Sequence, residues 1–307
     1  MSDIEIRKFS KKFGSFTAVN SIDLTVNRGE LFGLIGPDGA GKTTLMRVIC
    51  TLLLPTTGTI QVRGLDVTKN IDRIRAMLGY MPQRFSLYQD LSVEQNLMFF
   101  ADLFEVGTEE RTARLKQLYR FSRLEPFKNR RAGALSGGMK QKLALSCALI
   151  HTPEILILDE PTFGVDPVSR QEFWDILRSI QEQGTTILVS TAYMDEANQC
   201  DRIALQFKGE IKAIDTPERL KSDYRYPLYR LQARNVYHLY DYFNSRKEVH
   251  NAQIFGDAVH VSFSADPDNE AWQIYRERTG GNMTHWEKHH PSIEDIFLDI
   301  MRRDDEN

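Results

Sequence analysis

The chain has 307 residues, of which 41% are hydrophobic and 26% are charged. This composition is typical of a globular protein, and the length suits one large domain and a smaller one. The 39 basic and 42 acidic residues give a net charge of −3, so no bulk basic character points to nucleic acid as a partner.

The cysteines and the N-terminal segment indicate a cytoplasmic, reducing environment. Cys50, Cys147 and Cys200 lie far apart and form no CxxC pair, which favours buried free thiols. The segment MSDIEIRKFSKKFG carries charges but no apolar core, so we expect no signal peptide. No apolar run approaches the ~20 residues of a membrane-spanning helix, so any membrane role is expected to act through a partner.

Short strands alternate with helices through the first two thirds of the chain. Residues 4–9 and 21–26 alternate apolar and polar side chains, as half-buried antiparallel strands do. Residues 31–35 form an apolar run typical of a buried strand, and a helix is predicted from Lys42 to about Leu53. Further strands are predicted at residues 59–63, 78–81, 155–158 and 186–189. This alternation favours a mostly parallel sheet.

A glycine-rich loop joins the strand at 31–35 to the following helix. The run from Gly36 to Thr43, GPDGAGKT, matches GxxxxGK followed by Ser or Thr at every fixed position. Glycines in such a loop let successive backbone N–H groups wrap phosphate oxygens. Lys42 brings a positive charge to the β- and γ-phosphates, and the Thr43 hydroxyl can ligate Mg²⁺. The loop therefore predicts a nucleotide phosphate site.

Two acids follow another apolar run. Asp159 and Glu160 come directly after the strand predicted at 155–158. Ligands bind at the carboxyl ends of parallel strands, so these carboxylates are expected near the glycine-rich loop. Asp159 would hold Mg²⁺ through water, and Glu160 would polarise the attacking water as a general base. A strand that ends in solvated acids is common and needs no function. Because these two acids occur together with the Lys42 loop, we favour the catalytic interpretation.

A helical block lies between the loop and the two acids. Ser92 and Gln95 have the spacing of a capping box, and residues 108–124 form a second amphipathic pattern. The block, at about 88–134, is predicted to be an insertion into an α/β core. Three of its aromatic residues are expected in its own core: Phe99, Phe100 and Phe104. Three loop residues either line a cleft that receives another protein or anchor the loop: Phe85, Leu87 and Tyr88.

The segment LSGGMKQ at 135–141 has the character of an anion-binding helix start. Ser136 can cap the helix, and Gly137 and Gly138 let the backbone approach a phosphate. By itself, the segment is better explained as an ordinary N-cap after a glycine-rich turn. Asp166 and Pro167 open a later helix, with the acid at the N-cap and proline at the first helical position.

The pattern changes after about residue 216 and predicts a small α+β accessory domain. Its predicted strands are residues 228–234, 252–263 and 283–288, and its predicted helices are 236–245 and 268–279. The terminal segment PSIEDIFL begins an amphipathic helix that can pack on this domain. His285, His289 and His290 are expected at a solvated strand end rather than in a metal site, because strand neighbours point to opposite faces.

Five motifs together resemble the ATP-binding subunits of ABC transporters. They are the loop at 36–43, Gln83, LSGGMKQ at 135–141, the strand and acids at 155–160, and GVDP at 164–167, in the order of that family. The resemblance covers about residues 3–220. The short stretch between Gln83 and Leu135 excludes the long coiled-coil insertion of chromosome-maintenance relatives.

The resemblance implies an α/β fold, the P-loop NTPase fold of ABC ATPases. That fold has a mostly parallel sheet, an antiparallel β edge and a helical subdomain. We therefore predict an ATP-binding domain at 1–220, with the helical subdomain inserted at about 88–145. A C-terminal α+β accessory domain is predicted at 221–307.

The resemblance also implies roles for individual residues toward ATP and Mg²⁺. ATP would contact Phe13, Gly36, Asp38, Gly39, Ala40, Gly41, Lys42, Thr43 and Thr44, with Phe13 stacking on adenine and Phe16 as its rival. A partner subunit's ATP site would be completed by Ser136, Gly137 and Gly138. Asp166 would belong to the nucleotide-binding residues and communicate across the dimer. Mg²⁺ would be held by Thr43, Gln83 and Asp159. Catalysis would use Glu160 as the base, together with Gln83 and Lys42.

One departure from the family pattern concerns catalysis. The family usually has a His in a pattern like STHYMDEA, and this chain has Ala192 at that position. Alanine offers no donor to the γ-phosphate, and the loss of one such donor costs about 3 kcal/mol, roughly a hundredfold in rate. No spacing argument requires Thr191 or Tyr193 to replace it. We therefore predict slow or partner-dependent hydrolysis.

The terminal PSIEDIFL segment resembles that of ABC-2-type exporter ATPases, including multidrug-type ones. The resemblance implies a cytoplasmic ATPase that is peripheral to the membrane through permease subunits and pairs head to tail with a second ATPase domain. It also leaves open that the chain is one half of a tandem ATPase. The alternatives are a soluble ABC ATPase acting on ribosomes or nucleic acid, and a degenerate cassette that binds ATP and barely hydrolyses it.

Overall fold

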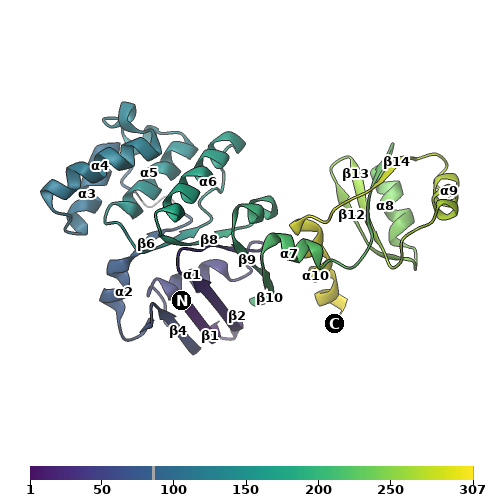
Figure 1. The fold of residues 1–307 in the computed structure, drawn as a ribbon, viewed down its shortest axis with the longest axis horizontal. Coiled ribbons are helices and arrows are strands. Elements are labelled where there is room, and N and C mark those ends of the chain that lie inside the picture. The colour runs from purple at the N-terminus through teal and green to yellow at the C-terminus, as the bar shows by residue number, and fades with distance from the viewer. Residues whose placement is uncertain (85–86, 307) are drawn as a thin grey trace. The chain divides into compact units, whose positions relative to one another are not determined.

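The computed structural model describes residues 1–84 and 87–306 and divides into two compact units, Met1–Thr216 and Pro217–Asn307 (Figure 1). The first unit contains all the motifs of the predicted phosphate site, and the second contains the accessory region. Phe85, one of the residues predicted to line a cleft, lies outside the described residues.

The apolar runs of the first unit form the strands of its central sheet. Among the described residues the strand order is β10 (Glu210–Asp215), β9 (Arg202–Phe207), β3 (Leu31–Ile35), β8 (Thr186–Thr191), β7 (Ile155–Asp159) and β6 (Leu78–Met81). Neighbouring strands are parallel except β10, which pairs antiparallel with β9 at one edge. Every residue of β3, β7 and β8 is buried, as in strands covered on both faces. The parallel order brings the carboxyl ends of β3 and β7 to the same edge of the sheet.

A second sheet of the first unit is antiparallel. Its strands lie in the order β2 (Phe16–Asn27), β1 (Ser2–Phe13), β4 (Thr57–Val62) and β5 (Leu65–Asp66). Ile22, Leu24 and Val26 are buried while the residues between them are exposed, which confirms the alternation predicted at 21–26.

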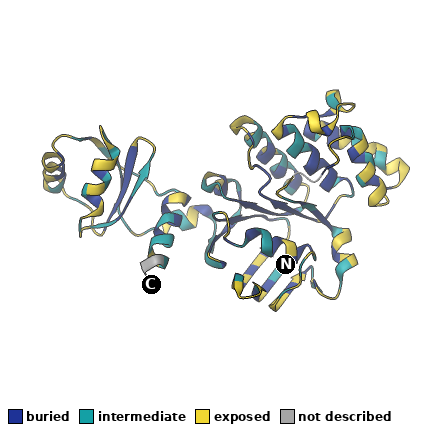
Figure 2. Ribbon diagram, turned by 180° about the vertical axis from the view of Figure 1, so that it is seen from behind, coloured by how far each residue is buried: buried dark blue, intermediate teal, exposed yellow. Residues whose placement is uncertain are grey.

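Helix α1 (Lys42–Ile49) packs between the two sheets. Its apolar side chains lie in one buried cluster with side chains of both sheets, for example Ile6 of β1 and Ile157 of β7. Figure 2 colours the chain by burial, and the strands of the central sheet are largely dark blue, which marks buried residues. The helix is shorter than the predicted range because the chain turns at Thr51, whose φ of 59° is left-handed.

The predicted helical block covers the other face of the central sheet (Figure 1). Its helices are α3 (Val93–Leu103), α4 (Thr108–Ser122) and α5 (Gly137–Leu149), and α6 (Pro167–Glu182) packs beside them. The predicted capping box is confirmed, because Ser92 Oγ accepts from Gln95 N at 3.1 Å and Gln95 Oε1 accepts from Ser92 N at 2.8 Å. Several elements were not predicted, among them α2 (Ile71–Met77), β9 and β10.

The second unit contains an antiparallel sheet with helices. The strand order is β12 (Val249–Phe255), β13 (Ala258–Phe263), β11 (Leu228–Ala233) and β14 (Met283–Lys288). Its helices are α7 (Pro217–Ser222), α8 (Val236–Asn244), α9 (Asn269–Arg278) and α10 (Ile293–Glu306). The prediction of a single strand at 252–263 is wrong. Gly256 has a φ of 56° and opens a tight turn, so the segment folds back as the hairpin of β12 and β13.

Across the helices of the described residues, none combines the length and apolar character needed to cross a bilayer.

Candidate functional site

The glycine-rich loop lies between β3 and α1, and its shape requires glycine at two positions. A Cβ at Gly36 would lie 2.1 Å from the carbonyl oxygen of Gln206. Gly41 has a φ of 103°, and a Cβ there would lie 2.5 Å from the carbonyl oxygen of Ala18. Any side chain at either position would therefore displace the backbone of a neighbouring strand.

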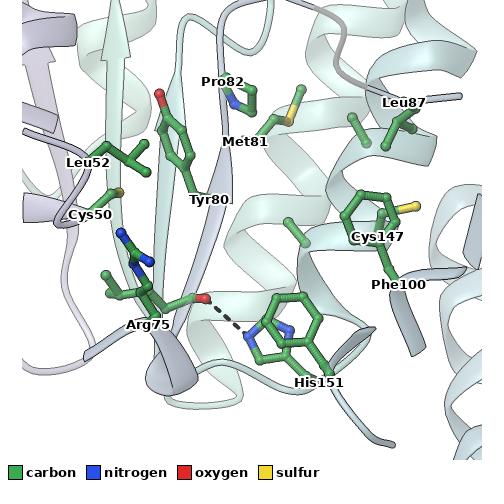
Figure 3. Close-up of a pocket in the computed structure, with 14 residues that line it drawn as sticks. Cys50, Leu52, Arg75, Tyr80, Met81, Pro82, Leu87, Phe100, Cys147 and His151 are labelled. Atoms are coloured by element: carbon green, nitrogen blue, oxygen red, sulfur yellow. Dashed lines mark hydrogen bonds between the residues drawn. The ribbon is translucent and has the colours of Figure 1, made fainter. Parts of the chain in front are cut away.

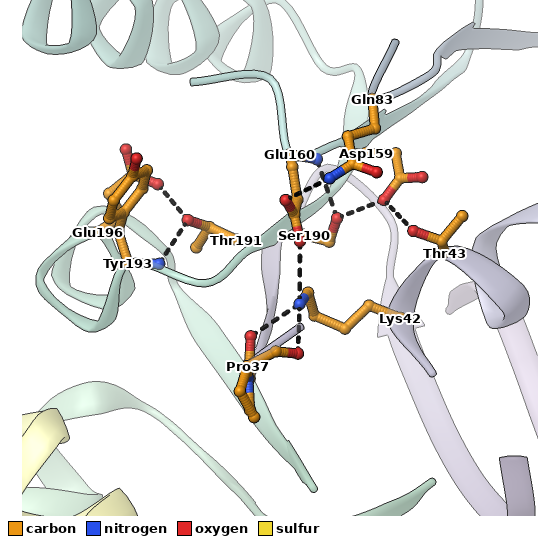
Figure 4. A network of polar contacts seen from close by, with 11 residues as sticks. Pro37, Lys42, Thr43, Gln83, Asp159, Glu160, Ser190, Thr191, Tyr193 and Glu196 are labelled. Carbon is orange, nitrogen blue, oxygen red and sulfur yellow. Dashed lines mark hydrogen bonds and ion pairs between the residues drawn. The ribbon is translucent and has the colours of Figure 1, made fainter. Parts of the chain in front are cut away.

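Lys42 points back into the loop from the first turn of α1. Its ammonium donates to the carbonyl oxygens of Gly36 at 2.7 Å and Pro37 at 2.9 Å. It also lies 3.0 Å from Glu160 Oε1, and the Lys42 side chain is only 3% exposed (Figure 4). The charge of Lys42 is therefore held at the centre of the loop by one carboxylate and two carbonyl groups.

Asp159 is the last residue of β7, and its side chain contacts α1. The sequence predicted this proximity of the two acids to the glycine-rich loop. Its Oδ1 accepts hydrogen bonds from the hydroxyls of Thr43 at 3.0 Å and Ser190 at 2.9 Å. Its Oδ2 is buried and has no hydrogen-bond partner among the described residues. Burial raises the pKa of Asp159, and its hydrogen bonds from Ser190 and Thr43 only partly offset that effect.

Glu160 occupies a strained position directly after β7. Its φ of 49° is left-handed, which is uncommon for a residue other than glycine. Its backbone N–H donates to Ser190 Oγ at 3.0 Å, and the Gln83 amide donates to its Oε2 at 2.8 Å. The carboxylate therefore lies between Lys42 and Gln83, which are far apart in the sequence.

A cavity of about 330 Å³ opens over this network. It is lined by Phe16, Ala18, the loop residues Asp38 to Thr44, Gln83 and Glu160. Phe13 is not among these lining residues. It pairs with Phe16 across the β1–β2 hairpin, and the Lys11 ammonium lies 5.0 Å from the centre of its ring. The adenine role of Phe13 therefore stays a prediction, and the cavity favours its rival Phe16.

The predicted signature residues lie at a separate, exposed helix start. Ser136 caps α5 by accepting from Met139 N at 3.3 Å. Asp166 caps α6 by accepting from Ser169 N at 2.9 Å, and hydrogen bonds to Ser169 lower the pKa of this exposed acid. A Cβ at Gly138 would lie 2.7 Å from the Ser169 side chain, so this glycine brings the two helix starts together. None of these residues lines the cavity over Lys42.

The loop after β8 contains Ala192 and a polar network that was not predicted. Glu196 accepts hydrogen bonds from the hydroxyls of Thr162 at 3.0 Å and Thr191 at 2.5 Å. The Tyr193 ring lies 4.0 Å from the guanidinium of Arg170. Figure 4 shows Thr191, Tyr193 and Glu196 beside the Lys42–Glu160 network rather than within it. Thr191 and Tyr193 therefore interact with Glu196 and Arg170 and not with Lys42 or Glu160.

Sequence reasoning also missed Gln206, which lies on β9 behind the glycine-rich loop. Its side chain is fully buried, and neither its amide nitrogen nor its amide oxygen has a partner in the part of the chain that the structure describes. The amide nitrogen lies 3.0 Å from the place of a Cβ at Gly41. A polar residue within the apolar run RIALQF is the signal that could have found it.

Comparison with known proteins decides the family. The sequence profile described as ABC transporter matches residues 19–163. The Nod factor export ATP-binding protein I of Burkholderia lata is 34% identical to this chain over 306 residues, which are 99% of this chain and 98% of that protein. The chain belongs to the ATP-binding proteins of ABC transporters. This membership confirms the resemblance drawn from the five motifs.

Two further relatives of this ABC ATP-binding chain match about 70% of its length. The probable multidrug ABC transporter ATP-binding protein YbhF of Escherichia coli is 44% identical over 219 residues, which are 71% of this chain and only 38% of that protein. A dimeric structure of an ATP-binding cassette in a post-hydrolysis state, bound to ADP and Pi, has a TM-score of 0.64 and 26% identity, and covers 69% of this chain and 98% of that chain. The predicted cassette fold is confirmed.

A second, apolar cavity of about 260 Å³ lies where the helical block meets β6 (Figure 3). Tyr80, Met81 and Pro82 line it next to Gln83, and Leu87 lines it from the following loop. Phe100 and Phe104 also line this cavity, so the prediction that these two fill a helical core is wrong. Phe99 is 37% exposed and packs edge to face on Tyr88 at 4.7 Å.

The three histidines near Trp286 do not form one group. His285 and His290 are exposed, whereas His289 is partly buried and lies near His260 and Asp295. The prediction of a solvated strand end therefore fails for His289, because the fold brings it partners from β13 and α10.

Proposed function

We propose that this chain is the ATP-hydrolysing subunit of an ABC-2-type exporter, cytoplasmic and bound to the membrane through permease subunits. The observation that carries the proposal is the convergence of Lys42, Thr43, Asp159 and Glu160 under one cavity in a cassette fold. The names of the relatives support export, since one is a Nod factor export protein and another a multidrug transporter protein.

In this proposal the loop binds the phosphates of ATP. The backbone N–H groups of the loop would contact phosphate oxygens, assisted by the positive end of α1. The loop residues are Gly36, Asp38, Gly39, Ala40, Gly41, Lys42, Thr43 and Thr44. Lys42 supplies the charge, because no other cationic side chain lines the cavity within the described residues.

The donor set around Asp159 fits Mg²⁺. Asp159 Oδ2 is a buried carboxylate oxygen without a partner in the described chain, and the Thr43 hydroxyl lies beside the other oxygen. These hard oxygen ligands match the preference of Mg²⁺, and Gln83 can add its amide oxygen after rotation. Mg²⁺ bound there with the nucleotide would neutralise phosphate charge during transfer.

Glu160 acts as the general base in the proposed reaction. Without nucleotide its carboxylate is paired with Lys42. When Lys42 turns to the phosphates of ATP, Glu160 is released to accept a proton from the attacking water. The Gln83 amide, 2.8 Å from Glu160 Oε2, then orients this carboxylate. The exchange of partners by Lys42 thus couples ATP binding to activation of the base.

The proposal includes head-to-tail pairing with a second ATPase domain. Ser136, Gly137 and Asp166 are exposed and lie outside the cavity over Lys42, so within one chain they have no role in its ATP site. With Gly138 they would complete the ATP site of the partner. A related cassette bound to ADP and Pi is dimeric, which supports the pairing of two such domains.

The apolar cavity at β6 is the proposed contact for a permease subunit. It is adjacent to Gln83, whose amide contacts the proposed base, so an apolar segment bound there would act on Glu160 through one residue. Leu87 lines this cavity, in agreement with the docking alternative for the loop after Gln83.

A weakly hydrolysing cassette is the second candidate, and Ala192 is the observation that favours it. The intact Glu160 network opposes it. The hydrolysing subunit depends on Glu160 as a base, whereas the weakly hydrolysing cassette does not. A substitution at Glu160 therefore distinguishes the two candidates.

The test compares Glu160→Gln with Glu182→Gln, an exposed glutamate at the end of α6. If Glu160 is the base, Glu160→Gln abolishes turnover and traps ATP in a stable dimer, while Glu182→Gln behaves as wild type. Equal turnover in wild type and Glu160→Gln would contradict hydrolysis at this site. Co-purification with a membrane permease tests the exporter part, and recovery only with ribosomes would contradict it.

A further inference from the structure

The accessory unit contains a cluster of imidazole and carboxylate groups that the proposed ATPase reaction does not use. His260 lies on β13, His289 follows β14, and Asp295 lies in the first turn of α10. One ligand atom from each of these side chains lies within 4.8 Å of the other two. Three separate segments of the accessory unit therefore meet at this cluster.

The alternation of β13 places His260 at the cluster. Val259, Val261 and Phe263 enter the apolar core of the accessory unit, so His260 points to the opposite face of the sheet. There His260 is only 9% exposed, and its Nδ1 lies 2.7 Å from Asp295 Oδ1. An imidazole nitrogen and a carboxylate oxygen are thus side by side in a nearly buried position.

Neighbouring groups hold both side chains in place. Asp295 Oδ2 accepts hydrogen bonds from the backbone N–H of Ser292 at 2.8 Å and from its hydroxyl at 2.6 Å. The ring of Phe255 stacks on His260 with centroids 4.2 Å apart. Ligands of protein-bound metals usually have such second partners, which fix the orientation of the donor atoms.

His289 supplies the third donor. Its ring centroid lies 4.7 Å from that of His260, and its backbone N–H donates to the carbonyl oxygen of Leu228 at 2.8 Å. A tetrahedral cation about 2.0–2.1 Å from each ligand would hold the ligand atoms roughly 3.3 Å apart. The cation would replace the hydrogen bond between His260 Nδ1 and Asp295 Oδ1, with loss of the shared proton to solvent. The partly buried His289 ring would reach the cation by side-chain rotation.

The charges around the cluster permit a cation. Arg230 pairs with His260 across β11 and β13 and would oppose a cation if it were uncompensated. Its guanidinium lies 3.2 Å from Asp257 and 3.5 Å from Glu287, so two acids compensate its charge.

We infer that His260, His289 and Asp295 form a site for a divalent transition cation of the zinc type, with water as the fourth ligand. Two imidazole nitrogens and one carboxylate oxygen suit Zn²⁺, whereas Mg²⁺ prefers oxygen ligands alone. The bound cation joins β13, the segment after β14 and α10. It therefore fixes α10 on the accessory sheet and acts independently of the ATP site.

Zinc titration of the full chain tests this inference. Calorimetry would be run on chelator-treated protein in excess Mg²⁺, with Asp159→Asn in every sample to remove the carboxylate of the phosphate site. The informative variant is His289→Ala, because it leaves the hydrogen bond between His260 and Asp295 intact. The matched control is His285→Ala, since His285 is exposed on β14.

We expect His289→Ala to weaken Zn²⁺ binding by at least about 100-fold, since loss of an outer partner alone costs about 10- to 100-fold. His285→Ala should bind as the parent does. With Co²⁺, the parent should show the visible absorption of a tetrahedral site, and added Zn²⁺ should slow hydrogen exchange in α10. Equal Zn²⁺ affinity of the parent and His289→Ala, or no binding by the parent, would overturn the site. Neither result bears on the ATPase proposal.

Discussion

The ammonium of Lys42 lies 3.0 Å from the carboxylate of Glu160, and their side chains are 3% and 6% exposed. A buried ion pair of this kind stabilises the fold only while both partners are present, because each charge alone would remain desolvated. In the proposed reaction the same pair separates when ATP binds. The stability of the nucleotide-free chain and its readiness for hydrolysis therefore depend on one contact.

The first prediction concerns the coupling of this pair. Lys42→Met leaves the Glu160 carboxylate buried without its cation and should lower the free energy of unfolding by about 3–5 kcal/mol. The double variant with Glu160→Gln should lose less than the sum of the two single losses. Urea unfolding without nucleotide measures the three variants. Strict additivity would show that the two side chains do not interact.

The second prediction concerns the pH dependence that Asp159 imposes. Burial raises its pKa in the folded chain above the value of about 3.9 for an unfolded Asp. The folded state therefore binds this proton more tightly, and the free energy of unfolding falls as the pH rises from the unfolded to the folded pKa.

Asp159→Asn should remove this fall and stabilise the nucleotide-free chain at pH 7 by about 1–3 kcal/mol, while the Mg²⁺-dependent reaction is lost. Unfolding followed in chelator across the acid range measures the slope. An unchanged slope in Asp159→Asn would assign the pH dependence to another group.

The third prediction concerns Gln206. Both polar atoms of its buried amide lack partners in the described residues, so Gln206→Leu should raise the free energy of unfolding by about 1–3 kcal/mol. Gln61→Leu on β4 is the control, because Gln61 is exposed. Thermal unfolding measures the stability of both variants. If Gln206→Leu is less stable than the parent, the amide has a role in holding the loop.

The fourth prediction concerns Ala192. Since Thr191 donates to Glu196 and Tyr193 packs on Arg170, neither replaces the absent histidine. Ala192→His should raise the turnover of the assembled complex, by up to about a hundredfold if the full donor contribution is restored. Steady-state ATPase measurements with the partner subunits present provide the test. No gain in turnover would refute the account of slow hydrolysis.

The fifth prediction separates Phe13 from Phe16. Phe16 lines the cavity over the loop, so Phe16→Ala should weaken ATP affinity by about 1–3 kcal/mol through lost stacking on the base. Phe13→Ala should change it little. Nucleotide titration of both variants is sufficient, and the opposite ranking would restore Phe13 to the role implied by the family.

Much of the fold and the site could be predicted because the decisive signals are local. The apolar runs of β3 and β7 predicted buried parallel strands, and parallel strands bring their carboxyl ends together. The contact of Thr43 with Asp159 follows from that rule and from the short loop that joins β3 to α1. The ion pair of Lys42 with Glu160 does not, because it depends on side-chain rotamers in the nucleotide-free loop.

Other features depended on tertiary contacts that no local pattern records. The cluster of His260 with His289 and Asp295 forms only when α10 meets the face of β13 opposite its apolar side. The hairpin at Gly256 is a different case, because Gly256 and Asp257 are a local turn signal that the prediction of one strand at 252–263 overlooked. Phe100 and Phe104 have helical spacing, which indicates one common face and does not tell a packed core from the wall of a cavity.

The left-handed backbone of Glu160 has a consequence for protein engineering. A glycine would adopt its φ of 49° without strain, and an asparagine at Asp159 would relieve a buried charge. A directed-evolution screen that rewards heat resistance would therefore enrich inactive proteins altered at these two neighbouring positions. A useful library would keep codons 159 and 160 constant and place its diversity elsewhere.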